Sequence, residues 1–90
     1  MIESIDLNGV AISTKNIVHD GVTILEAYHD EDGIWQFLDA SRVLDENDSV
    51  VVSLGTMLNI DSTLKDVFNL TLGSKACRKD KNSNWVRKPL

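Results

Sequence analysis

The sequence predicts an α+β domain, built on a mainly antiparallel sheet of about four or five strands with two or three short helices packed on one side. Apolar residues alternate on either side of an acidic turn at residues 30–33, which indicates a β-hairpin. After the apolar run at residues 50–52, the apolar spacing changes to every third or fourth residue, as on one face of a helix. Near the end of the chain, a polar turn between residues 74–79 and 84–88 predicts a second, closing hairpin.

In the first half of the chain we expect a short strand, a brief helix and the acidic hairpin. Residues 5–12 lead into the strand, and Ser13 is the expected N-cap of a helix that contains Ile17 and ends at Asp20-Gly21. The hairpin consists of residues 22–29 and 34–38. Because both faces of residues 34–38 are apolar, this strand is expected to be central and covered on each side.

The second half begins with a polar connection over residues 39–49, followed by a short buried strand at residues 50–52. Asp61 or Ser62 is the expected cap of a later helix, and Gly73 is expected to end that region. The apolar stripes of the two helical turns are Leu54, Met57 and Leu58, then Leu64, Val67 and Phe68.

Length and composition favour one small domain over residues 1–90, because a second hydrophobic core would have too little chain. Cys77 is the single cysteine, so no intrachain disulfide can form, and we expect it to be half-buried in a strand. Trp35 is expected in the core. No apolar run reaches the ~18–20 residues that span a bilayer, and the N-terminus has no signal-peptide pattern. We therefore expect a cytoplasmic protein that does not contact membranes.

The charge is divided unevenly along the chain. Residues 1–72 carry thirteen acids and three basic residues, a net charge of −10, whereas residues 73–90 carry six basic residues and one acid, a net charge of +5. An acidic body repels nucleic-acid phosphates and attracts a basic protein, whose association it accelerates. The charge pattern therefore argues against nucleic-acid binding and favours a basic protein partner.

From the residue pattern we expect that the protein has no cofactor, no metal site and no catalytic activity. His19 and His29 have no second ligand at the spacing of a zinc site. Aligning Gly33 with the glycine of a calcium-binding loop puts Tyr28 at the first ligand position, so a hairpin turn explains the same acids better. The paired carboxylates fall in expected turns, whereas acid–base catalysis needs them in an enclosed cleft. We therefore expect a protein that is not an enzyme.

Five short segments occur in a recognisable order along residues 10–87. They are Gly33-Ile34-Trp35-Gln36-Phe37, Asp45-Glu46-Asn47-Asp48, Leu54-Gly55-Thr56-Met57-Leu58-Asn59-Ile60-Asp61 with Leu64, Leu72-Gly73-Ser74-Lys75-Ala76-Cys77-Arg78, and Trp85. This order resembles the immunity-protein-33-like group of small bacterial domains of unknown function (domain of unknown function 2185). The resemblance implies relatives among the immunity proteins of bacterial toxin systems, which bind and block a cognate toxin, and it implies no catalytic residues.

We therefore expect a non-enzymatic protein-binding domain, in the form of an immunity protein that binds and neutralises a basic toxin. The alternative is a structural or regulatory module that self-associates, as a homodimer paired through a strand edge or through the Trp85 hairpin. We expect the acidic residues of the turns to bind the partner because their charge density is high. We add Trp85 because an exposed tryptophan is a frequent binding hot spot. The expected protein-binding residues are Asp30, Glu31, Asp32, Asp45, Glu46, Asp48 and Trp85.

Overall fold

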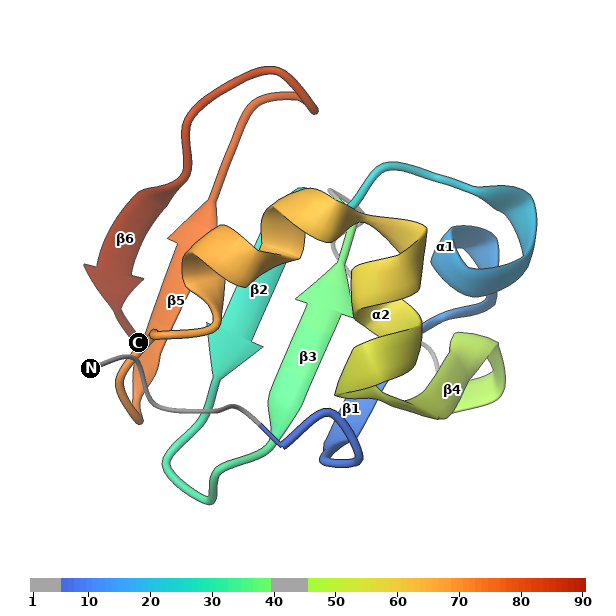
Figure 1. Cartoon of the computed structure of the whole chain (residues 1–90), viewed down its shortest axis with the longest axis horizontal. Coiled ribbons are helices and arrows are strands. Elements are labelled where there is room, and N and C mark those ends of the chain that lie inside the picture. The colour runs from blue at the N-terminus through green and yellow to red at the C-terminus, as the bar shows by residue number, and fades with distance from the viewer. Residues whose placement is uncertain (1–5, 40–45) are drawn as a thin grey trace.

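The computed structural model describes residues 6–39 and 46–90 of the chain (Figure 1). Its strands are β1 (Val10–Thr14), β2 (Glu26–His29), β3 (Trp35–Leu38), β4 (Ser49–Ser53), β5 (Ser74–Cys77) and β6 (Val86–Pro89). Its α-helices are α1 (Lys15–Asp20) and α2 (Leu54–Ile60), and its 3₁₀ helices are η1 (Glu46–Asp48) and η2 (Ser62–Val67).

Within the described residues, six strands form one mixed sheet in the order β4-β1-β3-β2-β5-β6. β1 and β3 run parallel, and the other four neighbouring pairs are antiparallel. The sheet therefore has more strands than the four or five expected, and it is mixed. The physical reason is the path of the chain: after α1, β2 runs opposite to β1 and two positions away in the sheet, and the hairpin then returns β3 between them, parallel to β1. Hairpins leave a local signal in the sequence, whereas this parallel pair depends on contacts between distant segments.

Small residues line the face of the sheet that the helices cover. Ala11, Ala27 and Ala76 are fully buried on three strands, and the register sets Ala27 opposite both Phe37 and Ala76. The alanines leave room for large side chains to approach the sheet closely. Figure 1 shows α2 and η2 over this face. Helical residues complete the core with Ile17, Leu54, Met57, Leu64 and Val67.

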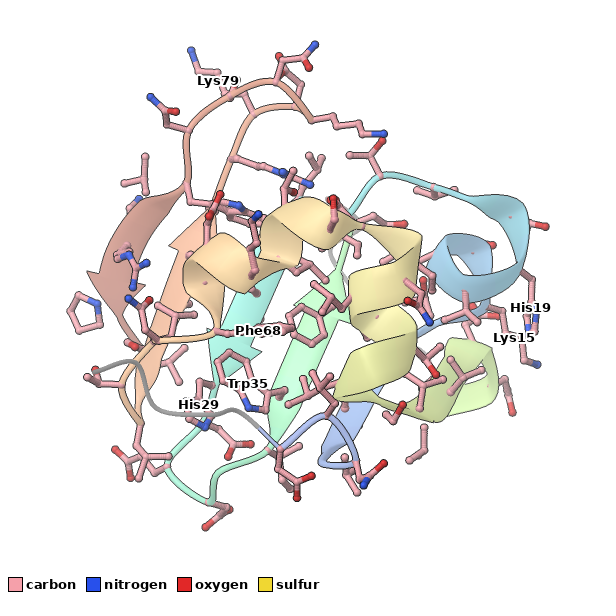
Figure 2. The ribbon with its side chains drawn as sticks, in the orientation of Figure 1. Lys15, His19, His29, Trp35, Phe68 and Lys79 are labelled. Atoms are coloured by element: carbon pink, nitrogen blue, oxygen red, sulfur yellow. The ribbon has the colours of Figure 1, made fainter. Side chains whose placement is uncertain are left out.

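A row of aromatic rings crosses the same face (Figure 2). The His29 ring stacks on Trp35 with 3.9 Å between centroids, and Trp35 stacks on Phe37 at 5.9 Å. Phe68, which follows η2, tilts against both Trp35 and Phe37. Nδ1 of His29 donates to the carbonyl oxygen of Leu70 at 2.8 Å, which ties the segment after η2 to the sheet. Trp35 is thus a core residue, as expected.

The acidic hairpin is confirmed, although β2 is shorter than expected. The turn contains Gly33 at φ 87°, and the Asp30 carboxylate accepts the backbone N–H groups of Asp32 and Ile34. β2 begins at Glu26 instead of residue 22 because the preceding segment has other partners. The N–H of Val22 donates to the carbonyl of Asn16 in α1. The carbonyl of Ile24 accepts from the side chain of Arg78.

The cap of η2 is the one that the sequence predicts, whereas the cap of α1 is a different residue. Asp61 caps η2, as predicted, by accepting the N–H of Thr63. Thr14, and not Ser13, caps α1, because Ser13 is still part of β1 and its hydroxyl donates to the carbonyl of Phe37 at 2.7 Å. Ser53 caps α2.

Two strands that were expected to be buried have an exposed side. β4 forms one edge of the sheet, and the Val51 side chain is 71% exposed. β3 is central, but Ile34 and Leu38 lie on the face opposite the helices, where Ile34 is exposed and Leu38 half-buried. A continuous apolar run predicts burial on both faces, yet only the position of a strand in the sheet decides how much of it is covered.

We predict that Leu64→Ala lowers the free energy of unfolding by about 2–5 kcal/mol, because Leu64 is fully buried and its removal leaves a cavity. Leu72→Ala is the matched control, since Leu72 is 59% exposed, and it should change stability by less than about 0.5 kcal/mol. Denaturant titration measures both variants. Equal losses would contradict the placement of Leu64 in the core.

Candidate functional site

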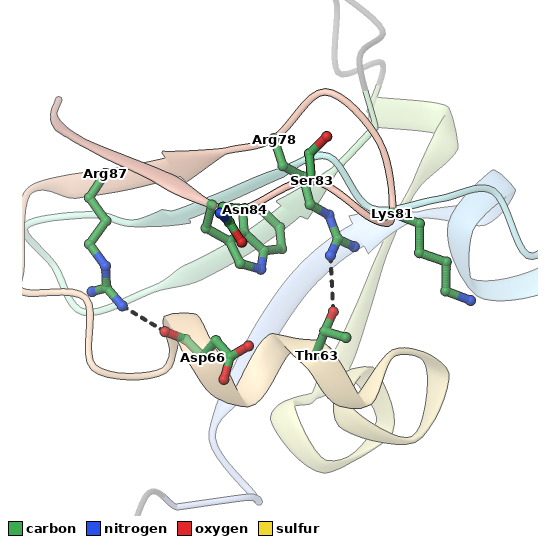
Figure 3. A pocket seen from close by; sticks show the side chains of 8 residues that line it. Thr63, Asp66, Arg78, Lys81, Ser83, Asn84 and Arg87 are labelled. Atoms are coloured by element: carbon green, nitrogen blue, oxygen red, sulfur yellow. Dashed lines mark hydrogen bonds between the residues drawn. The ribbon is translucent and has the colours of Figure 1, made fainter.

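A pocket of about 300 Å³ lies between η2 and the C-terminal hairpin formed by β5 and β6 (Figure 3). η2 contributes Thr63 and Asp66 to its lining. The hairpin contributes Arg78, Lys81, Ser83, Asn84, Trp85 and Arg87. In Figure 3, Lys81 and Arg87 stand at opposite ends of the pocket, with Thr63 and Asp66 between them on the helix side.

Arg78 is the buried centre of this region. Its side chain is 1% exposed, and its guanidinium makes a 2.7 Å ion pair with Asp61. The remaining donors reach the carbonyl of Ile24 at 3.0 Å and the hydroxyl of Thr63 at 3.0 Å. Because each nitrogen has a partner, the guanidinium is held in one orientation and its charge is balanced by the Asp61 carboxylate.

The environment of Asp61 shifts its titration. Burial alone would raise the pKa of the Asp61 carboxyl, but hydrogen bonds from the Thr63 hydroxyl and from Arg78 outweigh it and hold the pKa below its ordinary value. The same carboxylate accepts the backbone N–H of Thr63. Asp61 therefore both caps η2 and pairs with Arg78, the buried arginine that follows β5.

Trp85 packs on the other side of Arg78. The guanidinium carbon lies 4.2 Å from the centroid of the Trp85 ring, a cation–π arrangement. Trp85 is half-buried against the core, and its Nε1 is buried without a hydrogen-bond partner among the described residues. A buried donor without a partner costs about 1–3 kcal/mol, and no described residue satisfies this N–H.

The turn between β5 and β6 is organised by Asp80. Its carboxylate accepts from the Ser83 hydroxyl at 3.0 Å and from the N–H of Asn82 at 2.8 Å, and these bonds lower the Asp80 pKa. Arg87 donates to the backbone carbonyl of Asp66 at 2.6 Å, which links β6 to η2. Asp80 therefore orders the turn, and Arg87 ties the two walls of the pocket together.

The structure does not bring the predicted binding residues together. Asp30, Glu31 and Asp32 share the turn between β2 and β3, next to the end of the sheet where His29 pairs with Ser74. Trp85 precedes Val86, which pairs with Cys77 at the opposite end of β5. Asp48 is exposed before β4, at the far edge of the sheet.

The two predicted acids Asp45 and Glu46 lie at the start of the second described range or just before it. Glu46 begins η1, and Asp45 lies outside the described residues. Of the acids in the hairpin turn, Asp30 has a structural role through its two backbone hydrogen bonds. Glu31 packs near Gly73, whose φ of 76° marks the turn before β5.

The second surface of interest is the sheet face opposite the helices. Strand alternation places Ile12 beside Val51 and Gln36 on this face, with Val10 also exposed there. We call the five apolar side chains over β4, β1 and the β3 segment the open apolar patch: Val10, Ile12, Ile34, Leu38 and Val51. No core residue among those described lies on this face.

The other half of that face is polar. Tyr28 lies opposite Lys75, whose Nζ is 5.7 Å from the ring centroid. Partial burial raises the pKa of the Tyr28 phenol, and the nearby Glu26 carboxylate raises it further. Cys77 is half-buried beside them, as expected from the sequence. The uncovered face therefore changes from apolar at β4 to cationic at β5 and β6.

Sequence reasoning selected Trp85 but did not select Arg78, Thr63, Lys81 or Arg87. A signal for Arg78 was present, because alternation from buried Ala76 places it on the helix-covered side. A charged side chain on that side requires a buried partner. The partner itself, Asp61, is seventeen positions away and could be found only from the fold.

Comparisons with protein-family models, curated proteins and solved structures find no match to the chain. The resemblance described above therefore stays a prediction. Among the described residues, no group of three or more His, Cys, Asp or Glu side chains is arranged to hold a metal ion. Over the same residues, none of the helices has the length and apolar character needed to cross a membrane.

Replacing Arg78 tests whether it holds this region together. We expect Arg78→Met to lower the free energy of unfolding by about 3–5 kcal/mol, because Asp61 then loses its balancing charge. Arg87→Met is the matched control from the same pocket, and its loss should stay below about 1.5 kcal/mol, since it makes one exposed hydrogen bond. Denaturant titration of the two variants should separate them, and similar losses would refute the central role of Arg78.

The lowered pKa of Asp61 predicts a specific acid sensitivity. The folded state stabilises the carboxylate, so this contribution is complete above the unfolded pKa of about 3.9 and is lost as pH falls through the lower folded pKa. Asp61→Asn should therefore be less stable than wild type at pH 7, and the difference should shrink below about pH 4. Denaturant titrations across this range measure it. A difference that stays constant would show that the carboxylate charge is not involved.

Proposed function

We propose that this chain is a non-enzymatic protein-binding domain whose partner docks on the open apolar patch. The observation that carries the proposal is the exposure of β-branched side chains there, with Val51 71% and Val10 56% exposed on neighbouring strands. Contiguous apolar surface of this kind is typical of protein interaction sites, where an apolar centre is surrounded by a polar rim.

Charges around the patch support a basic partner. Asp30, Glu31 and Asp32 lie at one end of the strands that carry the patch, and exposed Asp48 lies at the other. Carboxylates at both ends complement a partner that surrounds an apolar area with lysine and arginine. The predicted acids therefore contribute as two separate parts of a rim, and not as one cluster.

The resemblance to immunity proteins suggests which basic protein this is. In this proposal the partner is a bacterial toxin, and the domain neutralises it by covering its active site or an adjacent surface. A surface built on a hydrogen-bonded six-stranded sheet suits this role, since a surface that needs no rearrangement loses less entropy on binding.

The test is capture of the partner by a tagged chain, with identification by mass spectrometry. We expect one basic protein to be retained in stoichiometric amount and to be released by salt. Val51→Lys should weaken its affinity at least about tenfold, because it places a cation in the apolar centre facing a basic partner. Lysine on an edge strand is tolerated by the fold, so the variant should remain folded.

Leu72→Lys is the matched control, since it adds the same charge at an exposed leucine outside the patch. It should retain the partner at wild-type affinity. Retention of the partner by both variants would exclude the patch as the interface, and loss in both would indicate an effect of net charge alone.

The acidic rim predicts a change in association rate. Glu31→Gln with Asp32→Asn should slow association with the captured partner by about tenfold at low salt and flatten its salt dependence. Asp30 is left unchanged because its carboxylate holds the turn. Surface-plasmon-resonance kinetics at several salt concentrations measure the effect. An unchanged rate would remove this turn from the interface.

Self-association is the second candidate function, and the edge strand β4 favours it. The five residues Ser49–Ser53 include no charge and no proline, the two features that usually protect a sheet edge from pairing. β6 at the other edge has both, in Lys88 and Pro89. A mass that doubles with concentration in light scattering, and returns to the monomer in Val51→Lys, would favour this function over binding of a different protein.

A further inference from the structure

Two lysines face each other on the uncovered side of the sheet, across the strands β5 and β6. Lys75 pairs directly with Lys88, so both side chains lie on the same face. The next pair along these strands, Ala76 with Arg87, lies on the helix-covered side, which places the two lysines on the opposite face. Lys88 is exposed and Lys75 is half-buried. We call these two side chains the lysine pair.

The lysine pair has no carboxylate partner among the described residues, where the one ion pair is that of Arg78 with Asp61. Like charges directly opposite each other on neighbouring strands destabilise a sheet. Glu26 is the one acid in β2, β5 and β6, and its carboxylate lies near the Tyr28 phenol, whose pKa is raised by partial burial and then by this charge. A carboxylate from another molecule would neutralise the lysines and remove the repulsion between them.

Tyr28 on β2 holds the Lys75 side chain on this face. The two residues are cross-strand partners, and the ammonium nitrogen lies 5.7 Å from the centroid of the phenol ring, a cation–π distance. The ring is neutral, so it orients the ammonium group without balancing its charge. A cation that the fold already positions loses less side-chain entropy when a carboxylate binds to it.

We propose that the lysine pair binds an acidic segment of a protein, whose glutamate or aspartate carboxylates accept hydrogen bonds from the two ammonium groups. In an extended segment, side chains at every second position point in the same direction, so several carboxylates can face the sheet together. Val86 lies on the same face of β6 and is 54% exposed, so it offers apolar contact beside the charges.

Charge and ring contacts favour an acidic protein segment over single-stranded nucleic acid, which also binds to open sheet faces. Nucleic acid binds there by stacking its bases on aromatic rings. Here the ammonium group of Lys75 lies over the Tyr28 ring, on which a base would stack. Residues 1–72 also carry a net charge of −10, which repels a long polyanion more strongly than a short acidic segment.

The lysine pair is separate from the surface in the proposed function. The open apolar patch covers β4, β1 and the β3 segment, whereas the lysine pair lies beyond β2, on the two strands at the other edge of the sheet. Binding of an acidic segment therefore does not require the basic partner. Each proposal is tested with its own variants, and failure of one leaves the other unaffected.

The test is a titration of the ¹⁵N-labelled chain with octaglutamate, followed through its backbone amide signals in two-dimensional NMR. Octaserine and an eight-nucleotide oligothymidylate are added in separate arms, as an uncharged peptide and as a nucleic-acid strand. We expect the signals of residues 74–77 and 86–88 to shift and saturate with octaglutamate and to stay in place with octaserine. The affinity for octaglutamate should fall as the salt concentration is raised.

Removal of the two charges should weaken the binding. Lys75→Gln combined with Lys88→Gln should lower the affinity for octaglutamate by about tenfold or more. Lys79→Gln combined with Lys81→Gln is the matched control, because it removes the same charge from exposed lysines that follow β5 and lie outside the strands. It should bind octaglutamate within about twofold of wild type.

Four results would overturn the proposal. One is the absence of a saturable shift with octaglutamate, and another is equal weakening by the two double variants, which would show a general charge effect. A third is tighter binding of the oligothymidylate, which would assign the lysine pair to nucleic acid. The fourth is a shift of the same signals when the chain alone is concentrated, which would assign it to a second copy. The wild-type titrations decide three of these without any variant.

Discussion

The buried guanidinium of Arg78 is the interaction on which the arrangement of the C-terminal half depends. Removing an arginine from water is costly unless its donors and its charge are satisfied, and here the partners come from three segments distant in sequence. Ile24 precedes β2, Asp61 and Thr63 begin η2, and Trp85 precedes β6. Satisfying one side chain therefore fixes the relative positions of the sheet, the helical layer and the hairpin.

A sheet covered on one side explains why the molecule offers two unlike surfaces. The helical segments are short, and they supply enough apolar side chains to bury the row of alanines and aromatic rings on a single face. The opposite face keeps its β-branched residues in contact with solvent, beside an unprotected edge at β4. The cationic hairpin, in contrast, folds against η2 and borders a pocket lined by polar and charged side chains. The open apolar patch and this pocket thus lie on opposite sides of the sheet.

Several elements could be predicted because their signals are local. The turn with Gly33, the helical spacing of Leu54 and Met57, and the cap at Asp61 each depend on residues within a few positions of one another. The candidate sites could be predicted only in part. Trp85 was selected by residue type, but its pocket joins residues 63–66 to residues 78–87, and no spacing in the chain connects these two segments.

The sequence by itself determined the α+β class, the two hairpins and the division between an acidic body and a basic end, because periodicity, turn chemistry and charge are properties of neighbouring residues. Tertiary structure decided that β1 lies parallel to β3, that the three valines of β4 form an edge, and that Arg78 is buried. These outcomes depend on which distant segments exclude water from one another. The residues next to a side chain in the sequence do not indicate which distant segment will cover it in the folded chain.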